Sequence, residues 1–82
     1  MYYLYLLRSL KDKKFYIGYT SDLKIRYKQH NKGEVKSTKH RRPLALIYYE
    51  AYSSGRLAER RETNLKKYGS AYTSLLKRLN LK

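Results

Sequence analysis

The sequence predicts an α+β domain: a three-stranded, mainly antiparallel sheet with flanking helices, in the order β-β-α-β-α-α. Near the N-terminus, residues 3–8 and 14–18 are rich in aromatic and aliphatic side chains and are joined by a short charged turn, which is typical of a hairpin. Further along, apolar residues recur at helical spacing in three segments, and one continuous apolar run follows the first of these. A hairpin followed by such segments indicates helices packed on a small sheet.

Within the hairpin, the alternation of a β-strand assigns side chains to faces. Tyr3, Tyr5 and Leu7 share one face of the first strand. In the second strand, Tyr16 and Gly18 share a face. Tyr5 and Tyr16 are therefore expected on the same side of the hairpin, and Gly18 leaves room beside them.

A helix is expected over residues 23–31, where apolar residues lie four apart. Thr20 or Ser21 is expected to cap its N-terminus, and Gly33 is expected to end it. A basic loop over residues 36–43 follows, and it has too few apolar residues to fold alone.

The continuous apolar run, residues 44–52, is expected to be an inner strand of the sheet. Residues 53–55 should break this strand and cap a second helix, residues 56–68. The inner face of that helix is predicted to hold Leu57, Arg61, Leu65 and Tyr68. A third helix is expected over residues 71–79, with an inner face of Tyr72, Leu75, Leu76 and Leu79.

Charge is the strongest feature of the composition. The 82 residues predict a single domain over 1–82, and 20 Lys and Arg against 6 Asp and Glu give a net charge of +14. Such a chain attracts polyanions, so nucleic acid is the expected partner. A membrane surface is less expected, because neither a basic amphipathic helix nor a lipidation signal stands out, and the cytoplasm is the expected compartment. The lack of cysteine excludes disulfides and Cys-based zinc sites.

The spacing of two tyrosine motifs resembles a known family. Tyr3-Leu4-Tyr5, then ten residues, then Tyr16-Ile17-Gly18 is similar to the paired motif of the GIY-YIG nuclease superfamily, and especially to its small, single-domain bacterial members. Tyr3 stands where the glycine of the first motif would be. The resemblance covers the chain from Tyr2 to about Tyr68. It implies the same order of elements and a metal-dependent endonuclease that hydrolyses phosphodiester bonds.

The resemblance also implies roles for four residues. Tyr5 would be the general base and Tyr16 would position phosphate or water, although these two roles could be exchanged. In the family an arginine, and often a histidine four residues on, follow the second motif; Arg26 and His30 match them. Arg26 would clamp the phosphate, and His30 would orient Tyr5 or a water, or relay a proton. Spacing alone favours a packed, hydrogen-bonded pair of Arg26 and His30 that braces the helix against the sheet. Nearby cations are expected to lower the pKa of Tyr5.

Glu62 matches the metal-binding glutamate that the family places in the helix after the third strand, with Glu59 as the fallback. It would be the single protein ligand of one Mg²⁺ or Mn²⁺ ion held mainly by water and substrate phosphate. The scarcity of acids disfavours a two-metal site, which needs several carboxylates. Without the resemblance, Glu62 reads as a helical salt bridge to Lys66.

Basic residues around these positions are the expected phosphate contacts, with DNA a more expected substrate than RNA. Gly18 is expected to give space to the substrate backbone beside Tyr16. The other candidates are Lys24, Lys28, Lys36, Lys39, His40, Arg41 and Arg42. A basic nucleic-acid-binding module without catalysis is the alternative that this charge supports equally well, and a domain tethered to a sequence-reading partner is a third.

Overall fold

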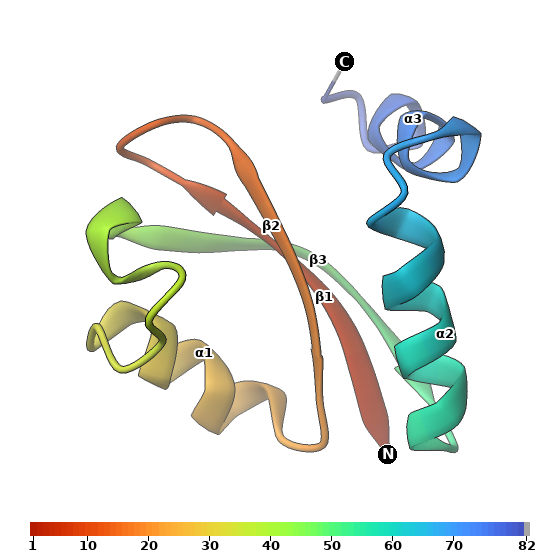
Figure 1. The fold of residues 1–82 in the computed structure, drawn as a ribbon, viewed down its shortest axis with the longest axis horizontal. Coiled ribbons are helices and arrows are strands. Elements are labelled where there is room, and N and C mark those ends of the chain that lie inside the picture. The colour runs from red at the N-terminus through yellow and green to blue at the C-terminus, as the bar shows by residue number, and fades with distance from the viewer. Residues whose placement is uncertain (82) are drawn as a thin grey trace.

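The computed structural model describes residues 1–81 and confirms the α+β class and the order of elements (Figure 1). A single turn of 3-10 helix, η1, is added within the basic loop. The elements are β1 (Tyr2–Ser9), β2 (Phe15–Thr20), α1 (Leu23–Asn31), η1 (Lys39–Arg41), β3 (Leu44–Tyr52), α2 (Gly55–Leu65) and α3 (Ser70–Arg78). Within residues 1–81, no helix is long and apolar enough to cross a membrane.

The three strands form an antiparallel sheet in the order β2-β1-β3. β1 is the central strand, and four consecutive residues of it, Leu4 to Leu7, are buried. The prediction that residues 44–52 form an inner strand is therefore wrong, because β3 lies at an edge. Its apolar run reflects helices on both faces of the strand: Leu44 packs on one side and Tyr48 on the other.

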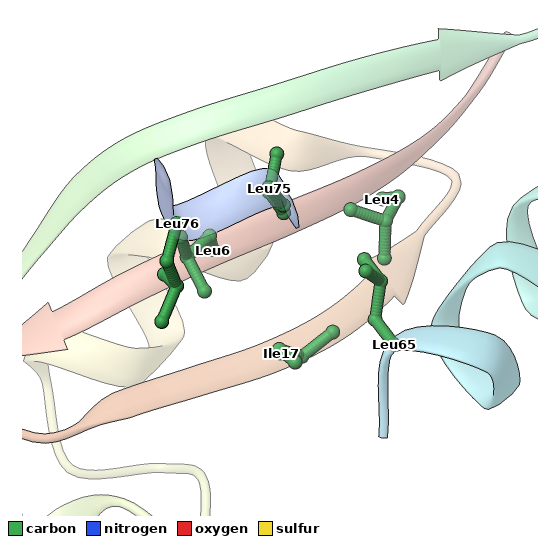
Figure 2. Close-up of a cluster of buried hydrophobic side chains, with 6 residues drawn as sticks. All are labelled: Leu4, Leu6, Ile17, Leu65, Leu75 and Leu76. Atoms are coloured by element: carbon green, nitrogen blue, oxygen red, sulfur yellow. The ribbon is translucent and has the colours of Figure 1, made fainter. Parts of the chain in front are cut away.

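The helices divide between the two faces of the sheet. α1 and η1 lie on one side, and α2 and α3 lie on the other (Figure 1). On the α2–α3 side, six buried side chains meet in the apolar cluster of Figure 2: Leu4, Leu6, Ile17, Leu65, Leu75 and Leu76. On the α1 side, Tyr5 and Leu7 pack against Leu44. The alternation predicted for the hairpin is thus confirmed, and consecutive residues of β1 serve different layers.

Two helix boundaries differ from the prediction. β2 continues to Thr20 instead of ending at Gly18, so the cap of α1 moves to Asp22, whose carboxylate accepts a hydrogen bond from the Ile25 amide. α2 ends at Leu65 instead of residue 68, since Tyr68 adopts a left-handed backbone with φ 55°. The predicted inner face of α2 is also partly wrong, because Leu57 is 42% exposed and Tyr68 is 60% exposed. Ala58 and Leu65 are the buried positions.

The remaining helix ends agree with the sequence. Gly33 follows α1 with φ 79°, a conformation that glycine adopts without strain. Ser54 caps α2 by accepting from the Leu57 amide. In α3, Leu75 and Leu76 are buried, and Tyr72 and Leu79 pack against them as predicted.

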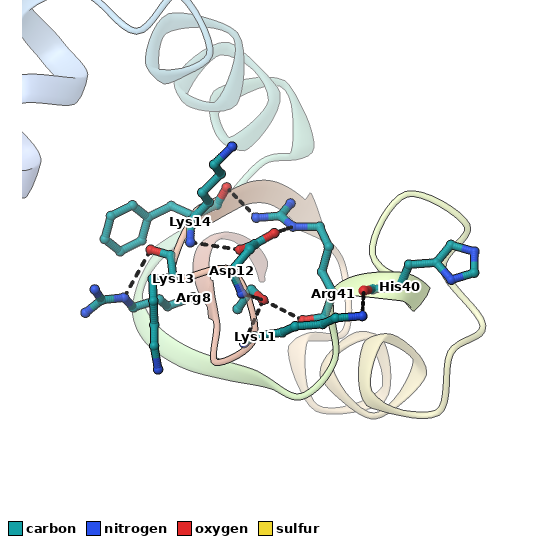
Figure 3. A network of polar contacts seen from close by, with 9 residues as sticks. Arg8, Lys11, Asp12, Lys13, Lys14, His40 and Arg41 are labelled. Carbon is teal, nitrogen blue, oxygen red and sulfur yellow. Dashed lines mark hydrogen bonds and ion pairs between the residues drawn. The ribbon is translucent and has the colours of Figure 1, made fainter.

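The basic loop is fastened to the hairpin turn at η1. The buried Ser9 hydroxyl donates to the Arg41 carbonyl at 2.6 Å and accepts from the amides of Lys11 and Asp12. Arg41 also pairs with Asp12 at 2.9 Å (Figure 3). These bonds satisfy the polar groups of the turn, and they connect residues 32 positions apart in the chain.

Candidate active site

A chain of buried polar side chains links β1, α1 and the basic loop. The Tyr5 hydroxyl lies 2.9 Å from His30 Nε2, and His30 Nδ1 lies 2.8 Å from the Thr38 hydroxyl. His30 and Thr38 have no solvent exposure, and Tyr5 is 1% exposed. The Thr38 hydroxyl donates to the Val35 carbonyl at 3.5 Å, so its lone pair can accept the hydrogen on Nδ1. This tautomer leaves Nε2 free to accept the Tyr5 proton.

Burial determines the protonation states of Tyr5 and His30 at neutral pH. It raises the pKa of Tyr5 to about 12, although Arg26 acts in the opposite direction. It also lowers the pKa of His30 to about 4, and the Arg26 charge adds to this shift. The expectation that cations would lower the pKa of Tyr5 is therefore wrong, because the loss of solvation outweighs the cation. At neutral pH both rings are uncharged.

Tyr16 lies beside this pair on the same face of the hairpin. Its ring centroid is 6.4 Å from that of Tyr5 and 5.0 Å from that of His30. The Lys66 ammonium lies 5.8 Å from the Tyr16 ring centroid. Tyr16 is half-buried, so part of its surface is open to a ligand.

Arg26 occupies the turn of α1 before His30. It is half-buried and donates a hydrogen bond to Gln29 at 3.2 Å. Its charge lowers the pKa of both Tyr5 and His30, in each case less than burial shifts them. A guanidinium in this position can hold a phosphate with paired hydrogen bonds.

Glu62 faces the same region from α2. Its side chain is 18% exposed and pairs with Lys66 at 3.3 Å, the helical salt bridge that spacing alone suggested. Its negative charge also raises the pKa of Tyr5, although far less than burial does. Glu59 instead accepts a hydrogen bond from the Tyr19 hydroxyl at 3.0 Å. Tyr5, Tyr16 and His30 thus lie in mutual contact, and the charges of Arg26 and Glu62 act on Tyr5.

The residues at this site could bind a divalent cation that has a single protein ligand. In the described residues, no three His, Cys, Asp or Glu side chains gather as a metal-binding group. Glu62 offers a half-buried carboxylate whose partner is the exposed Lys66, which a cation could replace. Mg²⁺ commonly binds through one or two carboxylates, water and substrate phosphate. Glu62 fits that pattern, and an all-protein cage is not available.

Gly18 has a different role from the expected one. It lies inside β2, and a Cβ built there would be 2.5 Å from the Tyr5 hydroxyl oxygen. The space above Gly18 is therefore filled by the Tyr5 phenol, and the expectation that it receives the substrate backbone is wrong. Because only a hydrogen atom fits, Gly18 fixes where the phenol lies.

Some of the residues predicted to contact phosphate are exposed, and others are hydrogen-bonded within the protein. Lys24 and Lys28 on α1 are exposed, as are Lys36 and Lys39 in the loop. Arg41 is committed to Asp12 and to the Phe15 carbonyl, so the prediction that it binds nucleic acid is not supported by its contacts. Arg42 is exposed but donates to the Lys39 carbonyl and lies over Gly33.

Thr38 is a site residue that the sequence did not reveal. It lies within the basic loop, where no periodic pattern separates a buried hydroxyl from the exposed ones around it. The backbone of Thr38 is held by Val35, the only apolar residue between α1 and Pro43, and Val35 is buried. That single apolar residue in a basic stretch was the available signal.

Known proteins similar to this chain share its extent and fold. Residues 1–80 match the family model described as the GIY-YIG catalytic domain. The UPF0213 protein SH2523 of Staphylococcus haemolyticus is 41% identical over 68 residues, which are 82% of this chain and 82% of that protein. A UPF0213 protein of Streptococcus pyogenes serotype M3 is 44% identical over 66 residues, covering 79% and 71% of the two chains. The solution NMR structure of the UPF0213 protein BH0048 from Bacillus halodurans is 34% identical, covers 96% of this chain and 85% of that one, and has a TM-score of 0.57.

Proposed function

The chain belongs to the GIY-YIG nuclease family, and on this premise we propose that it is a metal-dependent DNA endonuclease that hydrolyses phosphodiester bonds. The observation that carries the proposal is the buried Tyr5–His30 hydrogen bond, with Tyr16, Arg26 and Glu62 around it. We place this activity in the cytoplasm, with DNA as a more favoured substrate than RNA.

Substrate binding begins with charge. The net charge of +14 draws a polyanion to the surface, and the exposed Lys24 and Lys28 flank Arg26 on α1. Arg26 then holds the scissile phosphate and offsets the charge that develops on it during attack. Tyr16 orients the phosphate or the attacking water through its hydroxyl.

The proton of the attacking water passes along the Tyr5–His30 bond. Because the pKa of Tyr5 is about 12, roughly one molecule in 10⁵ carries the phenolate at pH 7. A neutral Tyr5 can accept the water proton on its oxygen while it donates its own proton to His30 Nε2. Burial is the main cause of the low pKa of His30, and a phosphate bound at Arg26 would offset only the smaller contribution of the Arg26 charge. Thr38 holds the imidazole in the tautomer that this transfer requires.

Glu62 is the residue that would hold the cation. A bound Mg²⁺ or Mn²⁺ would supply charge at the phosphoryl and leaving oxygens. Glu62 would hold the cation in place of its present partner, Lys66, whose ammonium could then contact phosphate.

The test is a comparison of two glutamate variants. Purified protein is incubated with branched, nicked and linear DNA and either Mg²⁺ or Mn²⁺. Glu62→Gln should lower the cleavage rate by roughly 10²-fold or more, because the cation loses its protein ligand. Glu34→Gln removes an exposed acid beyond α1 and should cleave at the wild-type rate. Both variants should unfold within about 0.5 kcal/mol of the wild type.

Two results would contradict the proposal. Cleavage by Glu62→Gln at the wild-type rate would remove Glu62 from the site. Binding that weakens steeply with salt, with no cleavage by the wild-type protein of any substrate or with either metal, would instead support the basic module without catalysis.

A further inference from the structure

A groove opens on the α1 face of the sheet, beside the residues already described. It has a volume of about 580 Å³ and lies between the start of α1 and strands β1 and β3. Its walls include Tyr3, Leu23, Lys24, Tyr27, Leu46 and Tyr49. This volume falls within the roughly 300–1,000 Å³ of small-molecule sites, so the groove can take a planar ring with its substituents.

Two tyrosine rings give the groove its chemistry. Tyr3 and Tyr49 meet edge to face, with ring centroids 6.0 Å apart and planes inclined by 67°. Tyr49 is 53% exposed, which is unusual for an aromatic side chain in a strand and leaves ring surface available. Tyr27 is fixed by its hydrogen bond to the Leu44 carbonyl at 2.9 Å, so that wall is rigid. The groove therefore presents a preformed aromatic surface.

The charges at the groove orient a nucleotide. Lys24 is exposed on one wall and can contact a phosphate. Asp22 lies on the same wall and repels phosphate, although its carboxylate is engaged by the Ile25 amide. The aromatic floor and the acid favour a base inside the groove, with its phosphate held outside by Lys24.

The groove lies on the same face of the sheet as Tyr5. In the sheet register, Tyr49 of β3 lies directly opposite Tyr5 of β1, and paired residues of neighbouring strands face the same side. A strand whose phosphate lies at Arg26 can therefore place a nearby base against Tyr49.

We propose that this groove binds an unpaired nucleobase of the nucleic-acid strand whose phosphate occupies the site of Tyr5 and Arg26. The inference rests on the proposed function for the identity of that phosphate site, and it adds a substrate class. In a duplex, each base is stacked and paired inside the helix and cannot enter the groove, whereas a single-stranded segment or a flap presents its bases freely.

Binding without cleavage tests this inference. Fluorescence anisotropy in EDTA compares three probes of 12 nucleotides: single-stranded oligothymidine, the same sugar-phosphate backbone without bases, and a duplex. Tyr49→Leu should weaken oligothymidine binding roughly 5- to 30-fold, because one base loses its stacking partner. Tyr49→Phe should retain the affinity. Tyr68→Leu is the matched control, since Tyr68 is 60% exposed but lies after α2, and it should bind like the wild type.

The other probes separate stacking from charge. Tyr49→Leu changes no charge, so binding of the duplex and of the backbone without bases should be unchanged, with the same dependence on salt. Equal binding of oligothymidine by Tyr49→Leu and by the wild type would overturn the inference. Because EDTA removes the cation, base-dependent binding can persist in a protein that cleaves nothing. The groove and the nuclease proposal can thus fail separately.

Discussion

The two faces of the sheet are both covered by helices, yet different chemistry lies beneath each cover. Under α2 and α3, the buried contacts are leucines and Ile17 (Figure 2). Under α1, the buried groups include Tyr5, His30 and Thr38, joined by hydrogen bonds. Apolar burial stabilises the fold, whereas burial of polar rings lowers stability unless each is hydrogen-bonded. The buried polar groups are therefore concentrated under α1, although the proposed metal ligand, Glu62, comes from α2.

A second contrast concerns two glutamates. Glu50 of β3 accepts hydrogen bonds from Tyr48, Tyr52 and both nitrogens of a bidentate Arg61 contact. Glu62 of α2 has a single lysine partner. A carboxylate whose lone pairs are all occupied is a structural tie, while one with free lone pairs can accept a cation. The number of partners separates the two acids better than their burial does.

The largest effects should come from substitutions at two neighbouring residues of β1, Tyr5 and Leu6, which face opposite sides of the sheet. Tyr5→Phe should lower the cleavage rate by about 10²- to 10⁴-fold, because the proton of the attacking water loses its acceptor. It should lower the free energy of unfolding by only about 1–2 kcal/mol. Leu6→Ala should instead lower that free energy by about 2–5 kcal/mol, since it leaves a cavity in the apolar cluster. The folded Leu6→Ala protein should cleave at nearly the wild-type rate.

Urea denaturation and single-turnover cleavage measure the two quantities. Tyr2→Phe is the control for Tyr5→Phe, because it removes a hydroxyl from an exposed position of the same strand. A Tyr5→Phe protein that cleaves at the wild-type rate would contradict the proposal that the Tyr5 hydroxyl takes part in cleavage.

The next effect is a dependence of stability on pH that originates on the α1 face. His30 has a pKa of about 4 in the folded protein and about 6.5 when unfolded, so the unfolded chain binds more protons between these values. The free energy of unfolding should be highest above pH 6.5 and should fall by about 3 kcal/mol as the pH decreases to about 4. Urea denaturation at several pH values measures this change. His30→Gln lacks the titrating group, so a decline of equal size in that variant would assign the effect to other residues.

The smallest effect compares two glycines. Gly18→Ala places a Cβ against the Tyr5 phenol and should lower the free energy of unfolding by about 2 kcal/mol, with a loss of cleavage as the phenol moves. Gly69→Ala meets no atom within 4 Å and should change stability by less than about 0.5 kcal/mol. Thermal unfolding of the two variants checks this order. Equal stability of both would mean that the phenol is not held against Gly18.

The sequence predicted the fold class and the order of its elements, and its errors have physical causes. Alternation along β1 and β2 was enough to place Tyr5 beside Tyr16. It could not show that β3 lies at an edge, because a continuous apolar run does not reveal that Ile47 and Tyr49 are exposed. Charge density suggested that Arg41 binds phosphate, but a basic side chain does not reveal in advance that Asp12 lies beside it. The direction of the pKa shift at Tyr5 depends on burial, which no local pattern supplies.

The contact between Ser9 and Arg41 has a consequence for ligand binding. Together with the Tyr5–His30–Thr38 chain, it ties the stretch from residue 38 to residue 41 to β1 at two points. A loop fixed at both ends has already lost its conformational entropy during folding, so a ligand does not have to order it again. Preorganisation of this kind lets a short, strongly basic chain hold a defined shape before any polyanion arrives.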